Sequence, residues 1–309
     1  MRLNASPFCL LSTVYWLLKR SYPMSLTRTE APLAKTGFIL ANGLRIRTAA
    51  WPSDGYPAIL VHGLSSGWQS WLPPLAYLWP TLSLTAVDLR GHGDSDKPET
   101  GYTLANYAAD VWAAIGKMRL KRPPVLIGHS LGGATVRRIA AEHAGALAAV
   151  IVEDSDLWGT EGGTPEQRRA YGQQWLANVR RPLPELIQTE MERNPNYSYR
   201  EAMERATRVQ NTADGVFLGA PEGVGLAAGE TYDDLLPRIT CPFLLVRGLP
   251  ELGGAVPEAA AARHKELIPD ATVVTVPNVG HSVHGQQPEA FSAAVLTFLR
   301  AHNIVEKEI

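Results

Sequence analysis

Short runs of apolar residues recur along the chain from residue 37 onward, separated by longer amphipathic stretches. Runs of this length without polar alternation are typical of buried strands, and they lie at residues 58–61, 84–87, 125–127, 148–152, 243–246 and 272–276. Between several of them, apolar residues at helical spacing predict helices over residues 104–118, 131–144, 257–267 and 288–299. This alternation predicts an α/β protein with a mostly parallel sheet and helices on both of its faces.

Two regions depart from the alternation. Near the start, apolar segments flank Asn42-Gly43, a dipeptide that favours the two-residue turn of an antiparallel hairpin. The stretch between residues 152 and 243 is too long for a loop. Its helical segments predict an inserted helical cap over the carboxyl edge of the sheet, and they lie at residues 167–180, 183–193 and 198–211. The glycine- and proline-rich residues 215–229 are interpreted as a flexible connection in or beside the cap.

These patterns predict three parts: an N-terminal extension at 1–36, a core made of 37–156 and 237–309, and a helical cap at 157–236. In the extension, the apolar run at 8–18 has basic flanks, as an export signal or anchor has. The run is too short to span a membrane, and no small-residue cleavage site follows it. Residues 1–23 could instead precede a start at Met24 or form a helix packed on the domain. We expect a cytoplasmic protein, or an exported one if residues 1–23 are a signal segment.

A serine between glycines lies where an apolar strand gives way to a helix. The segment Gly128-His129-Ser130-Leu131-Gly132 matches the pattern Gly-x-Ser-x-Gly. A serine hydroxyl is a weak nucleophile at neutral pH, so it needs a base and a backbone that presents it to the substrate. Small flanking residues allow the sharp turn, and the helix that follows directs its positive end at developing negative charge. We predict that Ser130 is a nucleophile; the alternative is a glycine-rich turn that only packs well.

His281 is the best placed of the eight histidines to act as the base. It ends the segment Pro277-Asn278-Val279-Gly280-His281, after the last predicted strand and before the last predicted helix. This position follows Ser130 in the chain, as the order serine, acid, histidine requires. His284 is the competing base. His62, where the strand at residues 59–61 runs into His-Gly, is interpreted as a residue that shapes its loop by hydrogen bonds.

The segments at residues 59–64, 128–132 and 277–281 together resemble the α/β-hydrolase fold superfamily. The resemblance covers roughly residues 37–304, within the broad group of carboxylesterases, lactonases, haloalkane dehalogenases and epoxide hydrolases. It implies a mostly parallel eight-stranded sheet with an inserted helical cap. It also implies Ser130 as nucleophile, His281 as base, and the backbone N–H groups of Leu64 and Leu131 as oxyanion donors. Dehalogenases and epoxide hydrolases of this group place an aspartate at the nucleophile, so Ser130 argues against both.

The carboxylate that orients the histidine has two main candidates. The base needs such a group to fix its tautomer and stabilise the imidazolium. Glu251 lies in the loop after the penultimate strand, about where the superfamily usually carries an aspartate, although counting back from Val256-Pro257 gives Gly253 instead and indicates a longer loop. Asp154, 24 residues after Ser130, lies at the strand end that holds the acid in dehalogenase-like relatives. The sequence leaves both open, with Glu153 as a third candidate.

Composition narrows the range of partners. The chain has 29 basic and 30 acidic residues and a formal net charge of −1, which provides no field to attract nucleic acid or an anionic membrane, and neither is expected as a partner. Its two cysteines, Cys9 and Cys241, suggest neither a disulfide framework nor a thiolate metal cluster. We expect no metal and no organic cofactor, because no ligand-spaced cluster and no phosphate-binding fingerprint is found. The expected partner is a small-molecule substrate; the sequence does not predict the oligomeric state.

Aromatic residues near the predicted site bear on the substrate. Trp68 follows the loop that carries Leu64, and Trp158 lies where the chain enters the predicted cap. His129 precedes Ser130 in the turn between strand and helix. We assign all three to substrate binding. The tryptophans could equally be ordinary core residues. We expect hydrolysis of carboxylic ester or lactone bonds in small to medium hydrophobic substrates through an acyl-enzyme. The alternatives are a serine-dependent carbon-carbon bond hydrolase, amidase or perhydrolase of the same fold, and a ligand-binding, receptor-like module that retains the pocket.

Overall fold

The computed structural model describes residues 28–143, 145–156, 165–194, 197–223 and 230–306. The predictions of an export signal at residues 1–23 and of a substrate contact at Trp158 therefore lie outside the described residues. Within the described part, no helix is long and apolar enough to cross a membrane.

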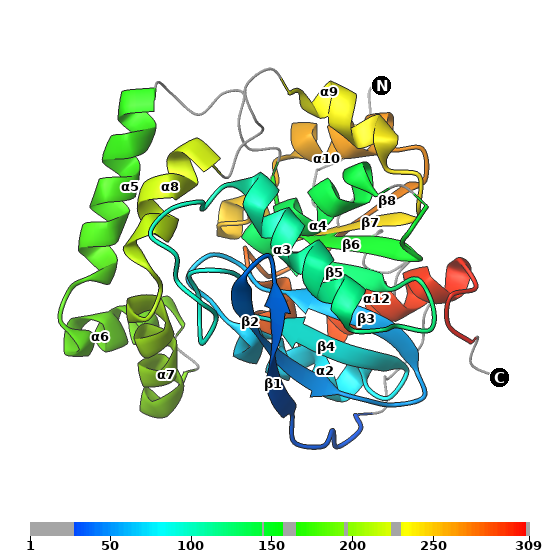
Figure 1. Ribbon diagram of the computed structural model, residues 1–309, viewed down its shortest axis with the longest axis horizontal. Helices are drawn as coiled ribbons and strands as arrows, with labels where there is room; N and C mark the ends of the chain where they lie inside the picture. Colours follow the sequence, from blue (N-terminus) through cyan, green and yellow to red (C-terminus); the bar gives the residue numbers. More distant parts are fainter. Residues whose placement is uncertain (1–27, 144, 157–164, 195–196, 224–229, 307–309) are drawn as a thin grey trace, which may run out of the picture.

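An eight-stranded sheet forms the centre of the molecule (Figure 1). Its strands in chain order are β1 (Lys35–Ala41), β2 (Leu44–Trp51), β3 (Tyr56–Val61), β4 (Leu82–Val87), β5 (Val125–His129), β6 (Ala149–Glu153), β7 (Phe243–Arg247) and β8 (Ala271–Thr275). Their order in space is β1-β2-β4-β3-β5-β6-β7-β8; β2 runs antiparallel to β1 and β4, and all other neighbouring strands are parallel. This confirms the predicted α/β-hydrolase sheet. The carboxyl ends of β3, β5, β6, β7 and β8 consequently meet at one edge.

The first two strands form the hairpin that Asn42-Gly43 predicts. Asn42 has φ 48° and Gly43 has φ 78°, which are the positive values that a two-residue type I′ turn requires. The hairpin pairs Ile39 with Ile46. β1 begins at Lys35, two residues inside the range predicted as the extension.

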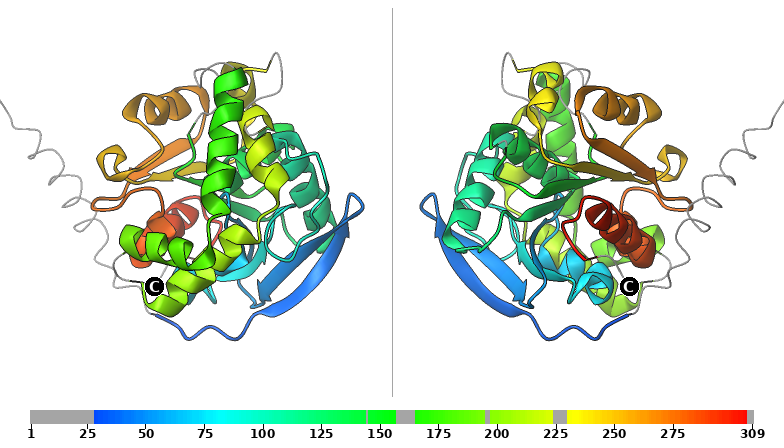
Figure 2. Two further views of the ribbon diagram at one scale, coloured as in Figure 1. Left: turned by 90° about the vertical axis from the view of Figure 1, so that its left-hand side faces the viewer. Right: turned by 90° about the vertical axis from the view of Figure 1, so that its right-hand side faces the viewer.

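Helices cover both faces of the sheet, and Figure 2 shows α3 and α12 on opposite sides of it. One face is covered by α3 (Leu104–Lys117), α4 (Leu131–Glu142), α9 (Tyr232–Leu235) and α10 (Glu258–Leu267). The other is covered by α2 (Leu72–Leu78), α11 (Val283–Gln286) and α12 (Pro288–Ala301). Because successive strand residues face opposite ways, Leu126 of β5 joins the first core and Val125 and Ile127 join the second. Each such buried side chain contributes roughly 2 kcal/mol of transfer free energy.

Between β6 and β7, the described residues form four longer helices, which we call the insertion: α5 (Pro165–Val179), α6 (Leu183–Arg193), α7 (Tyr199–Gln210) and α8 (Asp214–Gly223). α5 packs against α8 and α6 against α7, at one end of the molecule (Figure 1). Ser198 and Glu201 form a reciprocal capping box that begins α7. The interpretation of residues 215–229 as a flexible connection is wrong as far as Gly223. Val216 and Phe217 are fully buried, and this packing overrides the low helix propensity of the surrounding glycines.

Short helical turns complete the chain: η1 (Trp68–Trp71), η2 (Leu236–Arg238) and η3 (Pro250–Leu252). α9 lies within the range 157–236 that was predicted as the cap, yet its Tyr232 and Leu235 belong to the core cluster beside α3 and α4. The division into a core and a separate cap domain stays a prediction.

Candidate active site

Ser130 lies in the sharp turn between β5 and α4. Its φ of 53° and ψ of −115° are a strained combination for a residue with a side chain. Its N–H donates to the Glu153 carbonyl of the adjacent strand at 2.9 Å, which holds the turn in place. Gly132 allows α4 to approach β3, because a methyl group at this position would lie 2.1 Å from the Val61 carbonyl oxygen. This geometry gives Ser130 the backbone expected of a nucleophile elbow.

His281 and Asp154 meet at the same edge of the sheet. His281 lies in the loop after β8, and its Nδ1 donates to Asp154 Oδ2 at 2.7 Å. The Asp154 side chain is completely buried, whereas that of His281 keeps 40% of its surface exposed. Because Nδ1 carries the proton in this hydrogen bond, Nε2 of the neutral ring has the free lone pair that a general base uses.

Backbone amides hold the Asp154 carboxylate in position. The Gly248 N–H donates to Oδ1 at 3.2 Å, and the Ala255 N–H donates to Oδ2 at 2.7 Å. Both donors belong to the loop after β7, in which the sequence offered Glu251 as the competing acid. Glu251 itself is exposed on η3. The structure thus brings Asp154 and not Glu251 to His281, and the loop after β7 supplies donors rather than the carboxylate.

The loop after β3 lies directly against the elbow. A methyl group at Gly63 would lie 3.2 Å from Ser130 Cβ, so the loop that carries Leu64 passes beside the serine. Leu131 is the first residue of α4, where backbone N–H groups have no partner within the helix. The structure therefore places the two predicted oxyanion donors on segments that adjoin Ser130, and their role stays a prediction.

Hydrogen bonds from the buried His62 ring and from Arg205 of the insertion fix the shape of the loop after β3. His62 Nδ1 donates to the Gly63 carbonyl at 2.7 Å, and its Nε2 accepts the Leu89 N–H at 3.0 Å. Burial lowers the pKa of His62, so the ring stays neutral and both bonds persist at physiological pH. From above, Arg205 of α7 donates to the Ser65 carbonyl at 3.0 Å. This bond links the insertion to the residue after Leu64.

A second carboxylate–imidazole pair lies beside the first. Glu153 contacts His284 Nδ1 at 2.7 and 2.9 Å, and both side chains are buried. The two residues that the sequence offered as the third acid and the competing base therefore bind each other. The sequence signal for this arrangement was the adjacency of Glu153 to Asp154, together with the three-residue spacing from His281 to His284.

His129 occupies the space between the two pairs. Its Nε2 donates to the His281 carbonyl at 2.9 Å, and its ring centroid lies 4.7 Å from that of His281. Burial lowers the pKa of His129 to about 3, so the ring is neutral. His129 thus contacts the main chain of the proposed base; its assignment to substrate binding stays a prediction.

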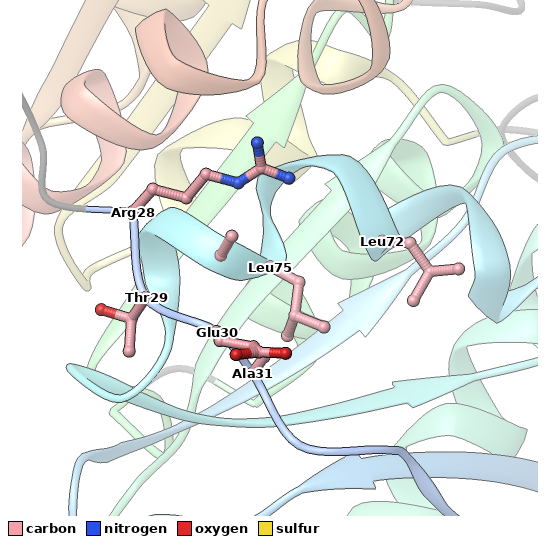
Figure 3. Close-up of a pocket in the computed structure, with 7 residues that line it drawn as sticks. Arg28, Thr29, Glu30, Ala31, Leu72 and Leu75 are labelled. Atoms are coloured by element: carbon pink, nitrogen blue, oxygen red, sulfur yellow. The ribbon is translucent and has the colours of Figure 1, made fainter.

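The structure gives Trp68 a packing contact. Its ring centroid lies 5.8 Å from that of Trp51, and the half-buried ring packs on the core beside α2. A substrate contact of Trp68 remains untested. An open pocket of about 460 Å³ is lined by residues 28–31 with Leu72, Leu75 and Ala76 (Figure 3). It includes none of the predicted site residues.

One group of side chains within the described ranges has the residue types of a metal site. His129, Glu153 and His284 place possible ligand atoms within 4.8 Å of one another. Glu153 already accepts hydrogen bonds from the His284 ring and main chain. Both oxygens of the carboxylate therefore have protein donors.

Comparison with known families identifies the class of this protein. A family model described as the alpha/beta hydrolase family matches residues 58–294, which is more than half of the chain. The chain belongs to the alpha/beta hydrolase family and is a hydrolase by that membership.

Individual relatives differ in their named activities. The chain is 31% identical over 250 residues to 2-(acetamidomethylene)succinate hydrolase of Mesorhizobium japonicum, covering 79% of this chain and 87% of the relative. It is 31% identical over 281 residues to a non-heme chloroperoxidase of Streptomyces lividans, covering 84% and 98%. The solved structure of the enol-lactonase from Burkholderia xenovorans LB400 matches with a TM-score of 0.70 at 21% identity, covering 85% and 99%. The last similarity establishes the fold alone.

Proposed function

We propose that this protein is a serine hydrolase that cleaves carboxylic ester or lactone bonds of small to medium hydrophobic substrates. The observation that carries the proposal is the 2.7 Å hydrogen bond from His281 Nδ1 to the buried carboxylate of Asp154, next to an elbow that holds Ser130 at positive φ. Of the two acids left open by the sequence, we assign Asp154 to the triad and leave Glu251 outside it.

The proposed reaction has two acyl-transfer steps. His281 Nε2 takes the proton of the Ser130 hydroxyl as its oxygen attacks the substrate carbonyl. The N–H groups of Leu64 and Leu131 stabilise the tetrahedral oxyanion, and each such donor is typically worth about 3 kcal/mol of barrier lowering. The imidazolium then gives its proton to the leaving alcohol, which leaves an acyl group on Ser130. A water molecule, deprotonated by His281, hydrolyses this ester and restores the enzyme.

The environment of Asp154 supports its role in this cycle. Two backbone N–H groups and the His281 ring donate hydrogen bonds to its oxygens and hold the side chain in place. A buried carboxylate stabilises the imidazolium that forms during each step. The 40% exposure of the His281 side chain leaves it accessible from the substrate side.

The relatives make three other acyl chemistries worth testing against the ester proposal. One relative is named as a hydrolase of an acetamidomethylene compound, and another as a chloroperoxidase. Amide hydrolysis, carbon-carbon bond hydrolysis and perhydrolysis all begin from the same activated serine. The substrate bond is therefore the part of the proposal that a direct measurement must decide.

A substrate panel with an active-site label tests the proposal. Purified protein is offered p-nitrophenyl esters, lactones, anilides and vinylogous diketones, and peracid formation is measured with peroxide and a carboxylic acid. We expect turnover of esters or lactones to exceed that of every other class, and a fluorophosphonate to label the wild type but not Ser130→Ala. Turnover confined to another class would overturn the ester assignment. Folded protein that the label does not modify would favour a ligand-binding module instead.

A further inference from the structure

The second carboxylate–imidazole pair, Glu153 with His284, has no step in the proposed reaction. Glu153 is completely buried at the end of β6, and His284 is 2% exposed on α11. The pair is held by three contacts: the His284 N–H donates to Oε1 at 2.9 Å, and Nδ1 lies 2.9 Å from Oε1 and 2.7 Å from Oε2. Its burial separates it from the substrate, so any contribution to catalysis must act through other groups.

Glu153 connects the two halves of the proposed triad. Its main-chain carbonyl accepts a hydrogen bond from the Ser130 N–H at 2.9 Å. Its side-chain carboxylate accepts hydrogen bonds from the main chain and the ring of His284. The residue after it is Asp154, and His284 lies three residues after His281. One residue therefore ties the nucleophile elbow to the loop that carries the base.

Packed rings continue this connection from His284 to His281. Trp71 stacks on His284 with centroids 4.4 Å apart, and His284 meets the edge of His129 at 5.0 Å. His129 in turn lies 4.7 Å from the His281 ring and donates to its carbonyl. Trp71 is fully buried, which limits movement of the whole stack.

Glu153 carries a negative charge in a buried position and therefore needs His284 as its partner. Burial alone would raise the pKa of Glu153, but the adjacent His284 ring and the hydrogen bonds from the His284 ring and main chain more than offset this effect. The pKa therefore lies below the usual range, and the side chain is a carboxylate at neutral pH. A buried pair of this kind is weak evidence of a purely stabilising role, since apolar replacements of equal volume are often neutral for stability.

We propose that Glu153 and His284 are positioning residues that set the approach of His281 to Ser130, by fixing the loop after β8 to the nucleophile elbow. The proposal rests on the proposed function only in taking Ser130 and His281 as the reacting pair. It predicts that loosening the pair displaces His281 and lowers kcat, while substrate binding is retained.

Two variants test the proposal. Glu153→Gln keeps the shape of the side chain but removes the charge and one acceptor. Glu153→Leu/His284→Phe replaces the pair by apolar groups of similar size and keeps a ring against Trp71, so no buried carboxylate is left without its imidazole. In both we expect kcat to fall about 10- to 100-fold, as a displacement of roughly 1 Å can cause, with KM within twofold. Fluorophosphonate labelling of Ser130 should slow in parallel.

His264→Gln is the matched control, because His264 is also fully buried and hydrogen-bonded, to Arg137 at 2.9 Å, but lies on α10. It should lower the melting temperature and leave kcat of the folded protein unchanged. Native kcat in the folded double variant, or an equal loss of kcat in His264→Gln, would overturn the positioning role.

A readout without substrate separates this proposal from the proposed function. The Nδ1 proton shared by His281 and Asp154 should give a far-downfield proton resonance in the folded wild type. We expect this resonance to shift or broaden in Glu153→Gln and to stay unchanged in His264→Gln. An unchanged resonance in Glu153→Gln would contradict the proposal even if the protein hydrolyses esters. If the wild-type protein does not hydrolyse esters, the proposed function is wrong. The resonance would still show whether Glu153 positions His281.

Discussion

The two carboxylate–imidazole pairs take their carboxylates from consecutive residues, the last residue of β6 and the residue after it, and differ in their exposure to solvent. Asp154–His281 has one buried partner and one that is 40% exposed, whereas both partners of Glu153–His284 are buried. Glu153 still follows the strand, so its side chain enters the layer between the sheet and α11. Asp154, with φ 41°, turns the chain and directs its carboxylate under the His281 ring. The same two functional groups are thus suited to proton transfer in one pair and to holding the backbone in the other.

Exposure is what distinguishes the two pairs. A general base must reach a substrate, so its ring needs an open side, while a group that orients other residues is most effective where nothing competes for its hydrogen bonds. If exposure decides the roles, substitutions in the Asp154–His281 pair will mainly lower the rate of the chemical step. Substitutions in the Glu153–His284 pair will mainly lower the stability of the fold.

The largest difference is expected between His281→Gln and His284→Gln. The first removes the proposed base and should lower kcat on the order of 10⁶-fold, as removal of a triad histidine does in other serine hydrolases. The second leaves the Glu153 carboxylate buried without its imidazole, so it should destabilise the fold by several kcal/mol, on the order of 3–5. Its effect on kcat should be smaller by orders of magnitude. Steady-state kinetics and thermal unfolding of both variants test this, and an equal loss of kcat in the two would refute the comparison.

The next largest effect concerns the acid. Asp154→Asn keeps the shape but no longer fixes the His281 tautomer, and it should lower kcat roughly 10⁴-fold. Glu251→Gln is the matched substitution, and it should stay within twofold of the wild type because Glu251 is exposed on η3. The measurement is kcat on one ester for both variants. Near-native turnover by Asp154→Asn would show that the hydrogen bond to His281 does not identify the acid.

The sequence predicted those parts of the site that depend on local chain geometry. The elbow around Ser130 is local, since a strand, a glycine-flanked serine and a helix determine it within ten residues. The sheet followed from the apolar runs, and Asn42-Gly43 gave the hairpin. The position of His281 after the last strand also followed from chain order.

The acid and the second pair depend on distances that chain order does not contain. Whether Asp154 or Glu251 reaches His281 is decided by how the loops after β6, β7 and β8 meet, and by the positive φ of Asp154. Glycine-rich composition likewise concealed α8, because burial of Val216 and Phe217 is a tertiary effect. Such features need the packed structure.

The burial of Glu153 beside His284 should also make the stability of the fold depend on pH. The folded-state pKa of Glu153 lies below its ordinary value of 4.5. The folded state therefore binds this proton less readily than the unfolded state does, so the associated stability is present above about pH 4.5 and is lost as pH falls through the folded-state pKa. Glu153→Gln lacks this contribution. Urea unfolding of wild type and variant between pH 7 and 3 should show a stability difference that narrows below pH 4.5; a constant difference would mean that Glu153 does not titrate in this way.

The smallest change in kcat is expected from breaking the hydrogen bond between the insertion and the loop that carries Leu64. Arg205 of α7 donates to the Ser65 carbonyl at 3.0 Å, one residue beyond the proposed donor Leu64. Arg205→Met keeps most of the apolar stem and removes this bond, whose net worth is about 1.5–3 kcal/mol. Only part of that is expected to reach the transition state, so kcat should fall up to about tenfold.

Arg200→Met on the same helix is the control for Arg205, since Arg200 is exposed and pairs with Glu204 on the surface. It removes a charge of the same sign but no contact with the core, and exposed pairs of this kind contribute little. We expect native kcat and KM for Arg200→Met, against a reduced kcat with KM within twofold for Arg205→Met. If both variants behave alike, the insertion does not shape the loop that carries Leu64. If only Arg205→Met has a lower kcat, the insertion positions the loop that carries Leu64 through this hydrogen bond. Glu153 and His284 are proposed to position His281 in the same way from within the core.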